Sequence, residues 1–379
     1  MFCAYLDLSM TTESVAENLV ALSAVPGIGR RTLARIYYHR RKHRWFWADF
    51  WVLKVSIIEK IPLAEKVVLA IQNWKREHEI GDFYAVLQKK NIRVITIGSK
   101  EYPQLLAQSE YPPVLLFAKG AVLDPCPQLP IAVVGTRQVT SYGRAVTTEI
   151  TKQLCQVGAT IVSGCMYGVD TVAHQAALAE KARTIAVLGF GFDHVYPAEQ
   201  LPVFDAILAS GGTILSEYVP DTGPKKGNFI ARNSIVAGMS RAVVVTEAAK
   251  RSGSHTTAQF ALESGRSVCA VPGPIYSPYS EGTKWLVNEG AVLVTSADDI
   301  LSELGIDSTG AGVGSRSTKP ELQEPLEQEI IAILQTGPQR SEALFERLSC
   351  SFAEYQACLT KLELSGYLER NGEQIAICY

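Results

Sequence analysis

Several features that would point to common classes of protein are missing from this sequence. Its eight cysteines include no CxxC pair and mostly stand in apolar segments, so we expect buried, reduced thiols rather than zinc ligands or disulfides. No run of eighteen apolar residues offers a membrane span. The first residues, MFCAYLDLSMTTES, lack the basic-then-apolar order of a signal peptide. The sequence therefore predicts a cytoplasmic protein without a metal centre.

The common nucleotide-binding motifs are also missing. There is no GxxxxGK[ST], and the first expected strand-to-helix loop, 135–143, reads GTRQVTSYG rather than GxGxxG. We therefore expect no nucleoside triphosphate, dinucleotide or other cofactor. The formal net charge of −2 excludes a generally basic surface, so any nucleic-acid binding has to come from a local patch.

The pattern that is present divides the 379 residues into three domains. Residues 1–82 favour a small helical domain, and residues 83–305 favour an α/β domain. Residues 306–323 contain STGAGVGSRST, which is typical of a flexible linker. Residues 324–379 favour three helices and a hairpin at Asn371-Gly372, and this order resembles a winged helix.

The α/β domain is predicted from a regular alternation that begins at Ile131. Apolar, β-branched runs alternate with helix-like segments, a pattern typical of an extended Rossmann-like, doubly wound and mostly parallel sheet. A helix at 83–88 with strands at 92–96 and 114–117 is expected as an addition to this sheet. The expected strands are 131–135, 160–164, 184–189, 213–217, 242–246, 267–271 and 291–295, and the first three helices are expected at about 142–157, 170–181 and 200–209.

A basic segment surrounds the strand expected at 242–246. Ser252-Gly253-Ser254 follows this strand and leads into a helix expected from Thr256, whose first N–H groups and positive dipole end could hold a phosphate. The alternative is that this loop only caps the helix. Between Pro224 and Ala258 one carboxylate, Glu247, stands against six cations: Lys225, Lys226, Arg232, Arg241, Lys250 and Arg251.

The C-terminal domain and the N-terminal domain differ in charge. Residues 324–379 hold nine carboxylates against four Lys and Arg, so we favour a protein-interaction or packing role there over DNA reading. In the N-terminal domain, Pro26-Gly27-Ile28-Gly29 resembles the turn of a helix-hairpin-helix or SAM-like element. Basic residues follow it up to Arg44, and then Trp45-Phe46-Trp47. We favour a solvated helical face with an aromatic core edge over an auxiliary DNA contact.

Several ordered motifs together resemble the DprA/Smf family of DNA-processing proteins. The resemblance implies a non-enzymatic protein of natural transformation that binds and protects single-stranded DNA, forms a homodimer and helps to load a RecA-type recombinase. It covers about 85–295 strongly. The motifs are VVGTR (133–137), SGCMYGVDTVAHQAAL (163–178), VLGFGFDHVYP (187–197), ILSEY (214–218), NFIARNSIVAGMS (228–240), EAAKRSGSHTTAQFAL (247–262) and AVPGPIYSPYSEGTKWLVNEGA (270–291).

The resemblance also implies a set of DNA-binding residues. In this set Arg137 and Lys226 hold phosphates, and Phe229 stacks on a base. The family usually shows FPxRNR, whereas this chain has FIARNS at 229–234, so it lacks a proline that stiffens a turn and a second arginine. The implied residues are Gly135, Thr136, Arg137, Gly164, Lys226, Phe229, Arg232, Asn233, Lys250, Ser252, Gly253 and Ser254.

An enzyme is the alternative class, because the pattern also resembles nucleotide phosphoribohydrolases of the LOG type or another nucleotide-binding Rossmann protein. Their PGGxGTxxE motif places a carboxylate three residues after the threonine, where this chain has Gln259 and Phe260. Glu217 and Glu247, each at a strand end, could form a substitute pair, although hydrogen bonding to nearby N–H groups is the expected fate. Asp170 and His174 could form an acid–base couple. We favour a helix cap for Asp170 and local packing for His174, and regard His255 as the better functional candidate.

Overall fold

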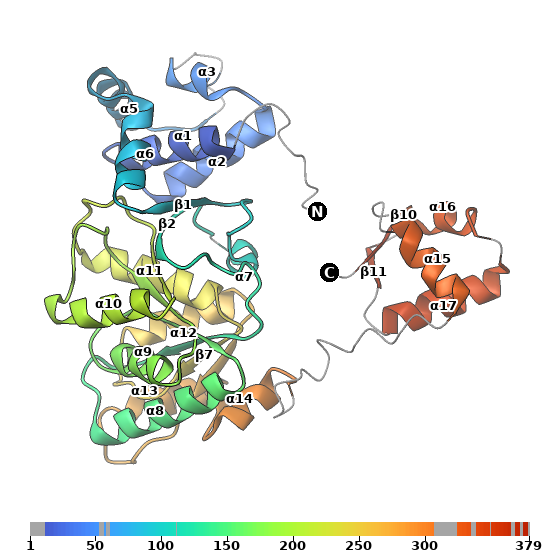
Figure 1. Ribbon diagram of the computed structural model, residues 1–379. Coiled ribbons are helices and arrows are strands. Elements are labelled where there is room, and N and C mark those ends of the chain that lie inside the picture. The colour runs from blue at the N-terminus through green and yellow to red at the C-terminus, as the bar shows by residue number, and fades with distance from the viewer. Residues whose placement is uncertain are drawn as a thin grey trace. The chain divides into compact units, whose positions relative to one another are not determined.

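The computed structural model describes residues 12–52, 57, 61–110, 112–306, 324–334, 339–348, 350–364, 368–371 and 374–377. The chain forms two compact units, Met1–Leu304 and Gly305–Tyr379 (Figure 1). The division lies one residue before the boundary predicted between residues 305 and 306. Of the predicted linker, 306–323, the structure describes only Ile306. No helix in the described ranges is long and apolar enough to cross a membrane.

The first unit is built on a sheet of nine strands in the order β1-β2-β6-β5-β4-β3-β7-β8-β9. Strands β3 to β9 run parallel, and β2 pairs antiparallel with both β6 and β1. The predicted α/β fold with a doubly wound, mostly parallel sheet and a two-strand addition is confirmed. The strands are β1 (Arg93–Thr96), β2 (Leu115–Gly120), β3 (Pro130–Val134), β4 (Thr160–Ser163), β5 (Thr184–Leu188), β6 (Thr213–Ser216), β7 (Ala242–Val245), β8 (Ser267–Ala270) and β9 (Val292–Leu293).

Helices cover both faces of this sheet, which explains why its strands are apolar throughout rather than alternating. Every residue of β3, β5 and β7 is buried. The helices of this part are α7 (Gln104–Ala107), α8 (Ser141–Gln156), α9 (Val169–Ala179), α10 (Leu201–Ala209), α11 (Lys226–Gly238), α12 (Ser254–Glu263), α13 (Glu281–Asn288) and α14 (Ala297–Glu303), with a 3-10 turn at Ala198–Gln200.

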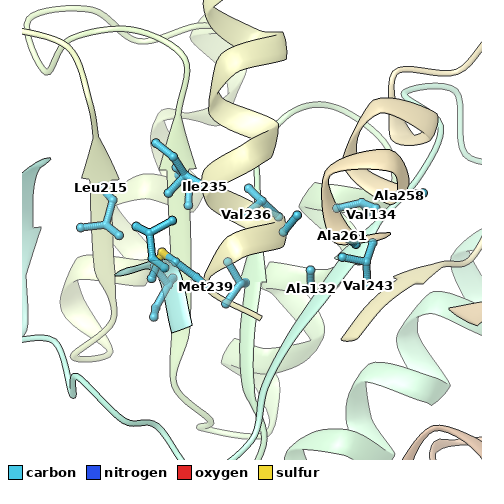
Figure 2. Close-up of a cluster of buried hydrophobic side chains, with 14 of the residues drawn as sticks. Ala132, Val134, Leu215, Ile235, Val236, Met239, Val243, Ala258 and Ala261 are labelled. Atoms are coloured by element: carbon cyan, nitrogen blue, oxygen red, sulfur yellow. The ribbon is translucent and has the colours of Figure 1, made fainter. Parts of the chain in front are cut away.

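Two of these helices, α11 and α12, form one layer of the core. Figure 2 shows Ile235 of α11 and Met239, the residue directly after this helix, near Leu215 of β6, and Ala261 of α12 near Val243 of β7. The five side chains are at most 3% exposed. This packing fixes α11 and α12 against the sheet, so that the loops before them are held at its edge.

The strand order reverses between β3 and β7. From β3 the chain moves outward through β4, β5 and β6, and then returns to pair β7 with the other side of β3. Loops at the carboxyl ends of the strands diverge at such a point and leave a crevice. The fold therefore predicts a binding site above β3 and β7.

The N-terminal part of the first unit is helical and lies at the β1 end of the sheet (Figure 1). The turn of Pro26-Gly27-Ile28-Gly29 joins α1 to α2, and Gly27 adopts φ of +86°, a conformation that favours glycine. Two members of the predicted aromatic edge belong to the core, because Trp45 and Trp47 are 8% and 2% exposed, whereas Phe46 between them is 56% exposed. The helices are α1 (Thr12–Ala24), α2 (Arg30–His43), α3 (Trp47–Trp51), α5 (Glu65–Glu77) and α6 (Ile80–Lys89).

In its described residues, the second unit has three helices and a three-stranded sheet of order β10-β12-β11. Tyr355 and Leu359 of α17 are fully buried in its own core. The predicted winged helix is confirmed, although residues 372–373 of the hairpin turn lie outside the described part. The elements are α15 (Pro325–Leu334), β10 (Gln339–Arg340), α16 (Ser341–Phe345), α17 (Phe352–Leu364), β11 (Leu368–Asn371) and β12 (Gln374–Ile377).

Candidate nucleic-acid interface

A crevice with a volume of about 890 Å³ opens at the carboxyl ends of β3, β4 and β7. Its walls come from the loop after β3, the start of α9, the first turns of α11 and the loop between β7 and α12. All the site residues predicted from the sequence line it except Lys250, which is exposed beside it. The structure thus brings together residues that lie up to 119 positions apart in the sequence, from Gly135 to Ser254.

The loop after β3 forms the floor of the crevice. Thr136 donates its backbone N–H to the carbonyl of Glu247, with 2.7 Å between N and O. Gly135 is required here, because a Cβ atom at this position would lie 2.6 Å from the same carbonyl oxygen. Arg137 then projects into solvent at the rim, and its guanidinium carbon lies 5.8 Å from the centre of the Phe229 ring.

Phe229 belongs to helix α11, which was not predicted from the sequence. The half-buried ring lies 5.7 Å from Tyr196 and 6.3 Å from Phe190, measured between ring centres. A Cβ atom at position 189 would approach the ring to 2.8 Å, so Gly189 is what lets the ring lie against this wall. Phe229 therefore presents an aromatic ring, held by its neighbours, to the crevice.

Arg232 also belongs to α11, but it is buried. Its role is therefore to stabilise the fold rather than to contact a bound molecule. Its Nη1 donates to the carbonyls of Gly164 and Val187 at the ends of β4 and β5. Burial lowers the pKa of Arg232, while the nearby Asp170 carboxylate raises it. Asp170 is not a helix cap, because it accepts a hydrogen bond from the backbone N–H of Met166 instead.

Asn233 connects α11 to the loop before α12. Its Nδ2 donates to the carbonyl of Gly253 at 3.3 Å and to Oγ1 of Thr256 at 3.0 Å. Helix α12 begins at Ser254, two residues before the predicted start, and Gly253 at its N-cap supplies no side chain. Ser252 accepts hydrogen bonds from the N–H and the hydroxyl of Ser254, which orders the loop.

Three helices begin at the crevice, since residues of the first turns of α9, α11 and α12 line it. Helix N-termini carry unpaired N–H groups and a partial positive charge, so they attract phosphate. The exposed cations Arg137, Lys226 and Arg251 stand around the same space. Exposed cations and helix N-termini thus surround one space, which makes the crevice electrostatically suited to anions.

The lining residues outside the predicted set include one cation and two exposed tyrosines, Arg251, Tyr167 and Tyr196. Arg251 had been recognised only as a loop cation, and Tyr167 and Tyr196 stood inside the quoted motifs without a role. The structure places all three on the crevice wall, with Tyr167 and Tyr196 41% and 43% exposed. The signal for the tyrosines was their position just after β4 and β5, where the carboxyl ends of parallel strands meet.

The two glutamates considered as a catalytic pair, Glu247 and Glu217, are both bound by other residues of the protein. Glu247 accepts hydrogen bonds from the backbone N–H and the hydroxyl of Thr140, at 2.9 and 2.7 Å. Glu217 binds the guanidinium of Arg30 through two hydrogen bonds of 2.5 Å. Neither is among the residues that line the crevice.

The two candidate histidines, His174 and His255, are not among the lining residues either. His174 is fully buried and its Nδ1 lies 2.7 Å from Oγ1 of Thr184, which confirms local packing. Burial lowers the pKa of His174 to about 3. The His255 ring packs against Trp285, with 5.0 Å between ring centres, and burial lowers its pKa.

Comparisons with known proteins agree with this architecture. The family model for DNA recombination-mediator protein A matches residues 93–305, and the model for the DprA winged helix domain matches residues 315–373. DNA processing protein DprA of Bacillus subtilis is 41% identical over 235 residues, which cover 60% of this chain and 79% of that protein. Protein Smf of Escherichia coli is 36% identical over 329 residues, covering 84% and 87%.

A comparison with solved structures agrees with the comparisons of sequence. The X-ray structure of DNA processing protein A from Streptococcus pneumoniae superposes with a TM-score of 0.65 at 32% identity, covering 76% of this chain and 97% of that one. The matched family models together span the sheet unit and the winged-helix unit. The chain therefore belongs to the DprA/Smf family of DNA-processing proteins.

Proposed function

We propose that the crevice binds single-stranded DNA without base specificity. The observation that carries the proposal is the combination of aromatic side chains with cations on one wall. Phe229 and Tyr196 offer aromatic rings for stacking, while Arg137 and Lys226 stand beside them for the phosphates. Aromatic stacking plus a basic groove is how proteins hold single strands of any sequence.

A single strand fits this site better than a duplex does. Stacking on Phe229 requires a base whose face is free, and bases in a duplex are covered by their neighbours. Reading of a duplex would instead require a basic helix that enters the major groove, and α11 presents its cations only at its first turn, at Lys225 and Lys226.

In the cell, we propose that the protein acts in natural transformation and recombination, where it protects incoming single strands and passes them to a RecA-type recombinase. We propose further that it works as a homodimer. Membership of the DprA/Smf family supports both proposals. Co-sedimentation with a bacterial recombinase and analytical ultracentrifugation of the purified protein test them.

We also propose that the protein acts without catalysis. Two carboxylates near the crevice already have partners, because Glu247 accepts a hydrogen bond from Thr140 and Glu217 binds Arg30. The third, Asp170, is buried beside Arg232, and burial raises its pKa. A hydrolase needs a carboxylate that can reach water at the substrate. Release of free base from nucleoside monophosphates by the purified protein would contradict this proposal.

The decisive experiment is fluorescence anisotropy with a labelled oligonucleotide, single-stranded and then duplex, over a series of salt concentrations. Wild type should prefer the single strand. Arg137→Gln and Lys226→Gln should each weaken binding and reduce the slope of log affinity against log salt by about 0.7, the value for one lost contact to a single strand.

The matched control is Lys152→Gln. Lys152 is exposed near the C-terminal end of α8, where the chain returns to the amino ends of the strands, so this change removes the same charge away from the crevice. If Lys152→Gln weakened binding as much as Arg137→Gln, general attraction rather than the crevice would explain the affinity.

A further inference from the structure

Helix α2 carries a stripe of basic side chains on its solvent face. Arg31, Arg35, Tyr38 and Lys42 stand at positions i, i+4, i+7 and i+11, so they share one side of the helix. Arg41 lies next to this line, and all five side chains are exposed. These five residues are called the basic stripe below. Helix α2 contains no aspartate or glutamate, so nothing on the helix itself offsets the charge.

Most of this charge is left without a counter-charge. Arg31, Arg41 and Lys42 form no ion pair with any residue of the described ranges. Arg35 donates to the carbonyl of Pro62 at 2.6 Å, which orients it without neutralising it. Like charges one turn apart disfavour a helix by a few tenths of a kcal/mol per pair. An anionic partner would remove this cost.

The neighbouring residue, Arg30, places the start of the basic stripe close to the crevice. Its guanidinium binds both carboxylate oxygens of Glu217, and it also donates to Oγ of Ser234 at 2.6 Å and to the carbonyl of Ala231 at 3.2 Å. Ala231 and Ser234 belong to α11, the helix that forms one wall of the crevice. These hydrogen bonds of Arg30 therefore hold the N-terminus of α2 against α11.

The contact lies on the far side of α11 from the crevice. Phe229 and Asn233 line the crevice, whereas positions 231 and 234 point roughly the opposite way at 100° per residue. The basic stripe thus begins about one helix diameter, ~10 Å, from the crevice, and it extends a further ~16 Å from Arg31 to Lys42. Between them stands Ile230, which lines the crevice and is 44% exposed.

We propose that a single strand of nucleic acid held in the crevice continues over α11 and lies along the basic stripe of α2. Arg31, Arg41 and Lys42 bind its phosphates, and the exposed Tyr38 ring offers a stacking surface. The inference rests on the proposed function, because the strand reaches α2 from the crevice. An extended line of cations suits a polyanion better than a single phosphate, which would need a closed cradle.

The test compares a short and a long oligothymidylate, about 10 and about 40 nucleotides, the first within the range of a single binding site. We expect the triple variant Arg31→Gln, Arg41→Gln, Lys42→Gln of the full chain to bind the short strand within twofold of wild type. For the long strand, we expect about tenfold weaker binding at low salt and a salt slope reduced by about 2, as for three lost phosphate contacts.

The matched control is the triple variant Lys152→Gln, Lys181→Gln, Arg183→Gln, which removes three exposed cations near the amino ends of the strands. Equal effects of the two triple variants on the long strand would overturn the inference and leave the basic stripe as a solvated face. Short-strand binding that survives in that case would keep the crevice assignment. Failure of wild type to bind either strand would instead overturn the proposed function, and this inference with it.

Discussion

At the scale of single residues, burial separates cations that look alike in the sequence. Arg137, Lys226 and Arg251 are exposed at the crevice and can meet a ligand. Arg232 is 4% exposed and binds the carbonyls at the ends of two strands, so it shapes the crevice from behind. One of the six cations between Pro224 and Ala258, on which the prediction of phosphate binding relied, therefore has a structural role.

His174 gives the molecule a pH dependence of stability that can be calculated. Its pKa is lowered to about 3 by burial, whereas an unfolded histidine takes up its proton near pH 6.5. Below that pH the unfolded chain binds one more proton, so stability present above pH 6.5 is lost as the pH falls toward 3. Between pH 7 and pH 5 this residue should cost about 2 kcal/mol of unfolding free energy.

The measurement is urea unfolding of wild type and His174→Gln at several pH values. The glutamine keeps a polar partner for Thr184 but does not titrate, so the variant should lose less stability than wild type between pH 7 and pH 5. Other titrating groups are common to both proteins and cancel in the difference. Parallel stability curves would show that His174 is accessible to protons in the folded state.

At the scale of elements, the sequence predicted what local chemistry determines. The parallel strands were found because both faces are buried and their residues are apolar and β-branched. Helix α11 was missed because Gly227, Asn228 and Asn233 are weak helix formers. Packing of Ile235 and Val236 on the sheet, at 0% and 1% exposure, stabilises it (Figure 2).

The candidate site was predicted in the same uneven way. All the residues predicted from motif order and strand ends line the crevice except Lys250, since the carboxyl ends of parallel strands must converge. Two features could not be predicted, because contacts between distant parts of the chain determine them. The first is which site residues are buried and structural and which are free to contact a bound molecule. The second is the partner of each carboxylate. The Arg30–Glu217 pair joins residues 187 positions apart, and nothing in the local sequence of either residue indicates the other.

That ion pair should hold helix α2 to the end of strand β6. The side chains of Arg30 and Glu217 are 17% and 9% exposed, so removal of either leaves a mostly buried charge. We expect Arg30→Ala to lower the unfolding free energy by about 3 kcal/mol, within the range for broken buried pairs. The double variant Arg30→Ala, Glu217→Gln should lose less than the sum of the single variants.

Urea unfolding of the four proteins completes the double-mutant cycle, with an expected coupling of about 1 to 3 kcal/mol. The matched control pairs Lys90 with Asp193. These residues also join the helical domain to the sheet at 2.7 Å but are about 40% exposed, so their coupling should be below about 1 kcal/mol. Equal coupling in the two cycles would show that burial does not decide the strength of these pairs.

At the scale of the whole molecule, the two units carry opposite formal charge. Residues 324–379 have a net charge of −5 and residues 307–323 are neutral overall, so a chain that ends at Ile306 changes from −2 to +3. Within the winged-helix unit, Lys361 is bound to Glu324 and Glu327 at 2.8 and 2.7 Å. Such a unit repels phosphate rather than attracting it.

We therefore expect the chain truncated after Ile306 to bind a single strand at least as tightly as the full chain. Any gain should be a few-fold at low salt and should vanish as salt screens the C-terminal charge. Fluorescence anisotropy over one salt series compares single-strand binding by the two proteins. Thermal unfolding shows whether the first unit stays folded in the truncated chain. A folded truncated chain with weaker binding would show that the winged helix contributes contacts to the strand despite its charge. Equal or tighter binding would assign the affinity to the unit that contains the crevice.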